Sequence, residues 1–123
     1  MIYNIKYKII LYVKGEKMIF QLGTPLLDAC VLAILIREDA YGYILTQNVK
    51  DIINISESTL YPVLRRLQQD DCLTAYDKPY QGRNRRYYKI TDSGKERCKT
   101  YIAEWNDYKA KVDNILMGGE SVG

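Results

Sequence analysis

The sequence predicts a mainly α-helical fold with one small β-hairpin and a long final helix. Three observations lead to this prediction. Apolar residues recur at helical spacing up to about residue 70, alternate as in strands between 73 and 90, and return to helical spacing afterwards. At 123 residues, with 47% hydrophobic and 27% charged residues, the chain has the size and composition of one globular domain. The expected order is helix, helix, short turn, helix, hairpin, long helix.

The first helix is predicted over residues 24–37. Thr24 is a suitable N-cap, and Pro25 suits the first helical position because its missing N–H group costs nothing there. The segment LLDACVLAILI that follows is apolar almost all the way round, so the helix must be covered on more than one side. A second copy of the chain is a natural cover.

The second and third helices follow a polar break at residues 37–40. The second is predicted over 41–53, and its apolar stripe consists of Ile44, Leu45, Val49, Ile52 and Ile53. After a short connection at 54–55, Ser56 is expected to cap a third helix that ends near Asp70. The inward stripe of this helix consists of Leu60, Val63, Leu64 and Leu67.

Pro62 lies within the third predicted helix. A proline inside a helix costs about 3 kcal/mol, so we expect regular helix to begin late, near Ser58 or Thr59. The side chains left facing outward are those of Ser58, Thr59, Tyr61, Arg65 and Arg66. Hydroxyls and guanidinium groups reach base edges and phosphates when a helix enters a major groove, although a solvated helix face has a similar composition.

The hairpin is predicted from two strands, 73–77 and 85–90, joined by the loop KPYQGRN. Pro79 and Gly82 are its turn signals, and Tyr88 and Ile90 are expected on the core side. Residues 83–89 carry four positive charges and no acid, as a loop along a phosphate backbone would. A basic hairpin directly after a short-turn helix pair indicates a winged helix-turn-helix, whereas the hairpin alone could be merely a soluble loop.

The last helix is predicted over 92–117, with Thr91 as its cap and Gly118 and Gly119 beyond its end. Its apolar residues are spaced 3, 4, 3, 4 and 3 apart, which is the seam of two packed helices: Cys98, Tyr101, Trp105, Tyr108, Val112 and Ile115. This seam is the expected dimer interface. It could also cover the first helix of its own chain, and both contacts can exist together.

Several residue types that catalysis and metal binding need are missing from the sequence. The chain has no histidine, and Cys30, Cys72 and Cys98 are scattered without a CxxC pair. We therefore expect no enzyme activity, no cofactor and no metal site. Free cysteines suit a reducing compartment, and no apolar run approaches the roughly 20 residues of a membrane span, so a cytoplasmic location without membrane contact is expected.

Three ordered motifs resemble those of the PadR-like transcriptional regulators: YGY at 41–43, STLYPVLRRL at 58–67 and GRNRRYYKITDSG at 82–94. The resemblance covers roughly residues 22–117. It implies a homodimeric winged-helix regulator, most often a repressor, on a pseudo-palindromic operator in double-stranded DNA. The DNA-binding residues that it implies are Tyr41, Tyr43, Ser58, Thr59, Tyr61, Arg65, Arg66, Arg83, Arg85 and Arg86. Tyr61, Tyr87 and Tyr88 could pack instead.

The resemblance has two further consequences. Asp71 stands where the family usually has glycine, and aspartate tolerates a left-handed backbone better than most residues. Some members of the family bind planar aromatic compounds between tryptophans at the dimer interface, so Trp105 is a candidate for binding such an effector, or it simply fills the interface. The alternative function is a winged-helix module that binds protein or RNA rather than duplex DNA.

The expected domain organisation has four parts. A poorly defined N-terminal extension covers 1–17, and the winged helix-turn-helix domain covers 18–91. The dimerisation helix covers 92–117, and a tail covers 118–123.

Overall fold

The computed structural model describes residues 4–5, 8–9, 12–13, 16–17 and 24–118. In the predicted extension, β1 (Asn4–Ile5) pairs with β2 (Lys8–Ile9), and β3 (Tyr12–Val13) pairs with β4 (Glu16–Lys17), both antiparallel. The tail beyond residue 118 and the side chain of Thr24, with its expected capping role, lie outside the described part of the chain.

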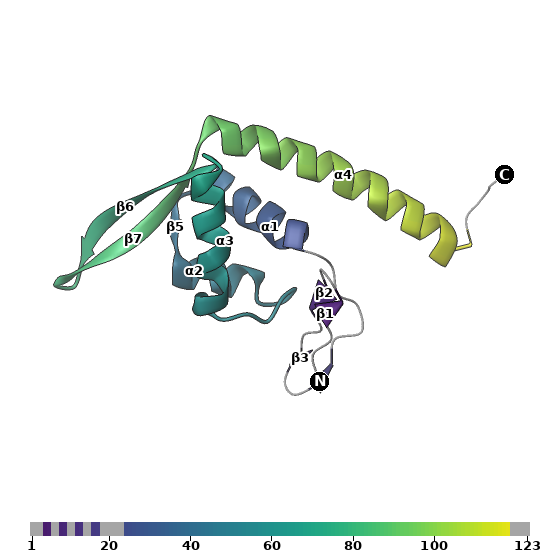
Figure 1. Ribbon diagram of the computed structural model, residues 1–123, viewed down its shortest axis with the longest axis horizontal. Coiled ribbons are helices and arrows are strands. Elements are labelled where there is room, and N and C mark those ends of the chain that lie inside the picture. Colours follow the sequence, from purple (N-terminus) through teal and green to yellow (C-terminus); the bar gives the residue numbers. More distant parts are fainter. Residues whose placement is uncertain (1–3, 6–7, 10–11, 14–15, 18–23, 119–123) are drawn as a thin grey trace.

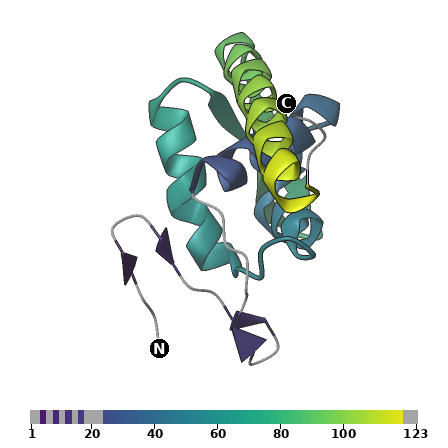
Figure 2. The same cartoon turned by 90° about the vertical axis from the view of Figure 1, so that its right-hand side faces the viewer.

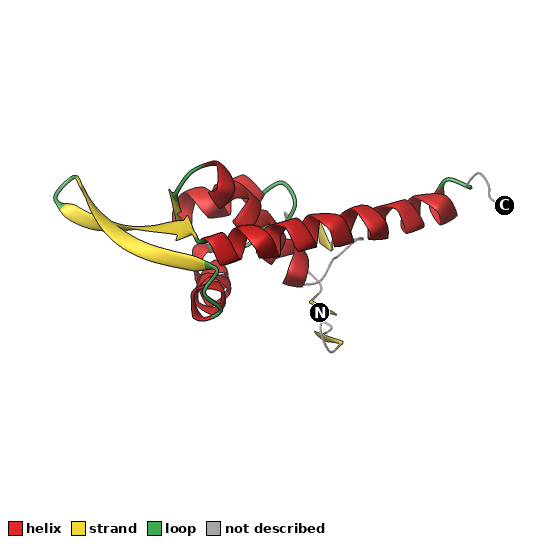
Figure 3. Ribbon diagram, turned by 90° about the horizontal axis from the view of Figure 1, so that it is seen from above, coloured by secondary structure: helices red, strands yellow, loops and turns green. Residues whose placement is uncertain are grey.

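The remaining elements confirm the mainly helical fold with its wing and long final helix. In chain order they are α1 (Thr24–Arg37), β5 (Ala40–Tyr41), α2 (Gly42–Val49), α3 (Glu57–Gln69), β6 (Leu73–Tyr80), β7 (Arg83–Ile90) and α4 (Asp92–Leu116). Figures 1 and 3 show the β6–β7 hairpin projecting from one end of the three-helix body, while α4 passes over α1 toward the opposite end.

The core lies between α1, α2, α3 and the base of the sheet. The predicted stripe of α3 is completely buried, and it meets buried leucines and valines of α1 and α2. From the sheet, Tyr88 and Ile90 turn into the same core, as expected from strand alternation. The end-on view of Figure 2 shows α4 lying beside α1, where Cys98 is fully buried.

The wing is a three-stranded antiparallel sheet in the order β5-β7-β6, one strand more than the hairpin predicted from the sequence. Ala40 belongs to the predicted break and Tyr41 to the predicted start of the second helix, yet Ala40 pairs with Tyr88 and Tyr41 pairs with Tyr87, so α2 begins at Gly42. Two residues are too few to show strand alternation in a sequence, so only the pairing with β7 identifies β5. The third strand attaches the base of the wing to the start of α2.

The hairpin also extends further than predicted. β6 and β7 pair without interruption from Leu73 opposite Ile90 to Tyr80 opposite Arg83, and only Gln81 and Gly82 form the turn. Their φ angles are 49° and 80°, the left-handed conformations that a two-residue hairpin turn requires. Pro79, expected in the loop, lies within β6 instead, where an edge strand tolerates a residue without an N–H group.

Two helix boundaries differ from the predictions. α2 ends at Val49 rather than 53, so residues 50–56 form the connection to α3, and Ile52, assigned to the apolar stripe, is 50% exposed. Regular helix in α3 begins at Glu57 rather than at Ser58 or Thr59, which places Pro62 inside it. The capping prediction is correct, because the Ser56 hydroxyl accepts a hydrogen bond from the Thr59 backbone N–H at 3.3 Å.

The start of α4 is anchored to the end of α3. The Thr91 hydroxyl donates to the Asp71 carbonyl at 2.7 Å and accepts from the Gly94 N–H at 2.9 Å, so it caps α4 as predicted. Asp71 has a φ of 63°, the left-handed conformation expected at the position where the resembling family has glycine. A Cβ on Gly94 would lie 2.3 Å from the Cys72 carbonyl oxygen, so α4 and this turn approach as closely as backbones can.

We expect Gly94→Ala to destabilise the protein by about 3 kcal/mol, because the added methyl group would overlap the backbone of Cys72 and the side chain of Ile90. At an unconstrained helical site the same change stabilises by about 0.5–1 kcal/mol, so the expected sign is reversed. Urea denaturation at fixed protein concentration measures the change. Ser93→Ala, at the exposed neighbouring position, is the matched control. Equal stability of the two variants would contradict this account of the junction.

Candidate nucleic-acid interface

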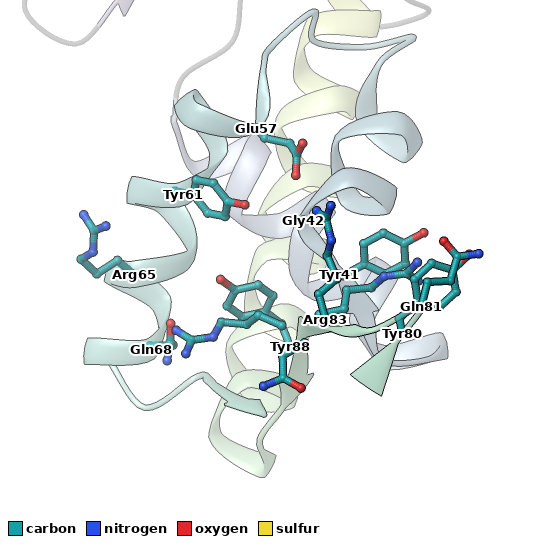
Figure 4. A pocket seen from close by; sticks show the side chains of 13 residues that line it. Tyr41, Gly42, Glu57, Tyr61, Arg65, Gln68, Tyr80, Gln81, Arg83 and Tyr88 are labelled. Atoms are coloured by element: carbon teal, nitrogen blue, oxygen red, sulfur yellow. The ribbon is translucent and has the colours of Figure 1, made fainter. Parts of the chain in front are cut away.

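A groove of about 840 Å³ separates α3 from the wing. In Figure 4, α3 supplies Tyr61, Arg65 and Gln68 on one side, while Tyr41, Tyr80 and Arg83 approach from the sheet on the other. Asn84, Arg85 and Arg86 also line it. Four of the lining residues are arginines and one is an acid, so the groove carries net positive charge. A cationic groove beside an exposed helix fits an anionic backbone.

The exposed face of α3 contains most of the residues that the sequence assigned to it. Ser58, Thr59 and Arg65 are exposed, and Tyr61 is 42% exposed, so these side chains are accessible to a ligand on this face. The Ser56 hydroxyl lies 2.9 Å from that of Ser58 and 3.1 Å from that of Thr59. These hydroxyls surround the N-terminus of α3, where the helix dipole favours a negatively charged group.

Gly42 allows α2 and α3 to approach at the end of the groove. A Cβ on Gly42 would lie 3.2 Å from a Glu57 carboxylate oxygen and 3.4 Å from the Tyr61 ring. The Glu57 carboxylate therefore lies at the N-terminus of α2, whose N-cap residue Tyr41 makes no side-chain capping bond. The sequence alone could not predict this contact, because it gives no information about the neighbouring helix end.

Two arginines of the wing are available to a ligand in different ways. Arg83 is exposed next to the turn, and its side chain makes no hydrogen bond or ion pair within the described residues. Arg86 is exposed as well, but its Nε lies 3.4 Å from the Asp77 carboxylate on the opposing strand. An exposed pair at this distance is weak, so Arg86 can exchange Asp77 for a phosphate at low cost.

Arg66 does not lie with the other outward residues of α3. Its guanidinium group donates a hydrogen bond to the Asp28 carboxylate of α1. Asp28 is a charged residue in a buried position. Removing the arginine would leave this carboxylate without its cation in the interior, which is strongly unfavourable. Arg66 therefore connects α3 to α1, while 41% of its side chain remains exposed, and its place among the DNA-binding residues stays a prediction.

Arg85 is engaged within the wing. Its guanidinium carbon lies 3.9 Å from the ring centre of Tyr41 and 3.4 Å from that of Tyr80. The guanidinium group also donates to the Tyr87 hydroxyl at 3.2 Å.

Tyr43, the last residue in the expected set, is 51% exposed on α2 but does not line the groove. The groove is also lined by three residues that the sequence did not predict: Gln68, Tyr80 and Asn84. Whether a residue faces the groove depends on the path of the hairpin, which the sequence does not give.

The residues of the expected dimer seam are buried at the start of α4 and exposed toward its end. Cys98 is buried in the core of its own protomer and Tyr101 is half-buried, whereas Trp105, Tyr108 and Ile115 are exposed by 39%, 51% and 81%. A second cleft, of about 370 Å³, lies beside Trp105 between α4 and the start of α1, and it is lined by Pro25, Leu26, Ala29, Tyr101, Glu104, Trp105 and Tyr108. The free part of the seam is therefore continuous with an apolar cleft.

The described residues hold no cluster of three or more histidine, cysteine, aspartate or glutamate side chains that could bind a metal ion. Burial raises the pKa of the Cys72 and Cys98 thiols, which disfavours the reactive thiolate form. Within the same part of the chain, no helix is long and apolar enough to cross a membrane.

Comparison with known proteins links this geometry to a family. The family model described as "Transcriptional regulator PadR-like family" matches residues 31–100. Transcriptional regulator Rv3488 of Mycobacterium tuberculosis is 36% identical over 84 residues, which is 68% of this chain and 75% of that protein. An uncharacterised protein X of Lysinibacillus sphaericus is 33% identical over 99 residues, covering 76% of this chain and 91% of that one.

Two solved structures show the same arrangement. The smu.1704 protein of Streptococcus mutans is 38% identical with a TM-score of 0.77, and the match covers 86% of this chain and all 100% of that one. A PadR-like transcriptional regulator of Bacillus cereus, BC4206, is 32% identical with a TM-score of 0.70 over 76% of this chain and 94% of its own. The similarity thus includes sequence and fold together.

Proposed function

Because this chain belongs to the PadR-like family of DNA-binding transcriptional regulators, we propose that it is a homodimeric repressor of a pseudo-palindromic operator. It is a regulator and not an enzyme. α3 enters the major groove with Ser58, Thr59, Tyr61 and Arg65, and the wing lies along the adjacent backbone with Arg83 and Arg86. Tyr41 and Tyr43, near the start of α2, extend the contact surface.

The observation that carries this proposal is the groove between α3 and the wing. An exposed helix face and a basic hairpin border one groove, so both can contact neighbouring parts of a duplex at the same time. The cationic wing supplies affinity that depends on salt, while the side chains of α3 reach base edges. A module that binds only protein would have no need of this charge, and structured RNA is distinguished by competition.

Exposed apolar side chains on α1 and α4 support a dimer that pairs through these two helices. Ile36 on α1 and Trp105, Tyr108 and Ile115 on α4 leave large apolar side chains in contact with water in the single chain. Covering them with the same surfaces of a second copy buries this area twice, which is the usual solution of a two-fold dimer. Two recognition helices then lie about one turn of DNA apart, and an occupied operator excludes other proteins from the same site.

Arg83→Ala should weaken binding to duplex DNA from the gene's own upstream region about fivefold, because a charge-assisted phosphate contact is lost. The dependence of log affinity on log salt should become shallower by about 0.9 for each contact, hence by about 1.8 for a dimer. Gel shifts over a series of salt concentrations measure both quantities. Lys111→Ala, which removes a cation paired with Asp107 on α4, should change neither. An unchanged slope in Arg83→Ala would show that the wing is not at the DNA.

Ile115→Asp should weaken dimerisation at least about tenfold, because it places a charge in the proposed apolar seam. The protomer should remain folded, since Ile115 is 81% exposed in it. Sedimentation equilibrium reports the monomer–dimer balance. Asn106→Asp adds the same charge at an exposed position off the seam and should leave the dimer intact. If Ile115→Asp pairs as tightly as the unmodified chain, α4 is not the interface.

We further propose that the cleft beside Trp105 binds a planar aromatic cation. Trp105 and Tyr108 place their ring centres 6.1 Å apart at this cleft, and Glu104 adds a negative charge to its lining. A ligand that favours one dimer geometry would change the spacing of the two recognition helices and so the affinity for DNA.

Titration with a planar cationic dye should quench the fluorescence of Trp105, which is the single tryptophan of the chain. Glu104→Gln should weaken the binding of the cationic dye and leave the tryptophan fluorescence of the unbound protein unchanged. Undiminished fluorescence at saturating dye would count against this binding site.

A further inference from the structure

Arg85 contacts tyrosine rings from two different strands. Its guanidinium carbon lies 3.9 Å from the ring centre of Tyr41 in β5 and 3.4 Å from that of Tyr80 at the end of β6. It also donates a hydrogen bond to the Tyr87 hydroxyl at 3.2 Å. A guanidinium group that contacts two rings gains cation–π attraction from each of them, which restricts its orientation.

The rings around Arg85 continue as one connected series down the wing. Tyr87 stacks on Tyr76 with ring centres 5.6 Å apart and meets the edge of Tyr41 at 5.4 Å. The Tyr76 hydroxyl donates to the Asp39 carboxylate at 2.6 Å, and this hydrogen bond raises the pKa of Tyr76. The series therefore links the end of the α1–β5 connection, through the sheet, to the turn of the wing.

The outer half of the wing needs such a support. β5 pairs only with Tyr87 and Tyr88, so the pairs from Asp77–Arg86 to Tyr80–Arg83 form a two-stranded ribbon without a third strand. An isolated two-stranded hairpin is at best marginally stable in water. Arg85 contacts β5 and the end of β6 together, and so joins this ribbon to the anchored base. Lys78 adds a longer contact, because its Nζ lies 5.4 Å from the ring centre of Tyr87.

We propose that Arg85 is a positioning residue that holds the wing at the angle to α3 required for duplex DNA, while Arg83 makes the phosphate contact. This inference rests on the proposed DNA-binding function for its consequence, but the clamp itself exists in the free protein. It replaces the sequence-based expectation that Arg85 contacts DNA in the same manner as Arg83 and Arg86.

The first test examines the free protein. Arg85→Lys keeps the positive charge but cannot fill the space between two rings with a planar group. Amide hydrogen exchange of residues 78–86 should become about fivefold to thirtyfold faster, as expected for the loss of one or two cation–π contacts. Arg83→Ala should leave this exchange unchanged, and the buried amides of α1 should stay protected in both variants. Equal protection of the wing in Arg85→Lys and the unmodified chain would overturn the clamp.

The second test examines DNA binding by a double-mutant cycle on the duplex from the gene's own upstream region. Arg85→Lys should weaken binding although its charge is retained, and adding Arg83→Ala to it should weaken binding by less than about twofold more, because a displaced wing has already lost that contact. If Arg85 contacts phosphate only, Arg85→Lys binds nearly normally and the two effects multiply, which overturns the proposal.

The two tests separate the inference from the function on which it rests. If the unmodified chain shows no salt-dependent binding to duplex DNA, the proposed function fails, and hydrogen exchange still decides whether Arg85 clamps the wing.

Discussion

The rest of the structure depends on the burial of one stripe of α3. Leu60, Leu64 and Leu67 are buried in the core that α3 shares with α1, α2 and the base of the sheet, and this packing determines which face of α3 remains for a ligand. Because residues three and four apart share a helix face, the same rotation that buries the leucines exposes Tyr61 and Arg65. A rotation of α3 would exchange its buried and exposed faces, so the hydrophobic effect that folds the domain also selects the side chains that we propose to face DNA.

The position of the wing relative to that face is fixed by backbone contacts that leave almost no freedom. Gly94 approaches the Cys72 carbonyl so closely that the end of α3, the base of the sheet and the start of α4 form one rigid junction. β5 attaches the same sheet to the start of α2. The outer part of the β6–β7 hairpin has no third strand, so its position depends on side-chain contacts. These contacts are made by the aromatic rings and Arg85. The wing is thus held at its base by hydrogen bonds to β5, and its outer half contacts that base through aromatic and cation–π contacts.

Two ion pairs connect the proposed dimerisation helices to the recognition helix. Arg66 of α3 binds the buried Asp28 of α1, and Arg97 of α4 lies 2.9 Å from Asp70 at the end of α3. α1 and α4 also form the cleft beside Trp105. A shift of either helix at the dimer interface would therefore be transmitted to α3 through directional contacts as well as through the packed core.

The sequence by itself determined the elements whose pattern is local. Helical periodicity located α1 and α3 and identified the buried stripe, Thr91 and Ser56 were recognised as caps, and strand alternation placed Tyr88 and Ile90 in the core. Features that depend on distant partners were decided by the tertiary structure. β5 has no periodicity of its own, Arg66 binds the buried Asp28 of another helix, and Arg85 contacts rings that come from two other strands. Pro62 and Pro79 were misjudged for the same reason, since packing of α3 and the edge position of β6 accommodate prolines that local propensity disfavours. Local patterns depend on neighbours within about four residues, whereas these contacts join residues far apart in the chain, so only the assembled fold could reveal them.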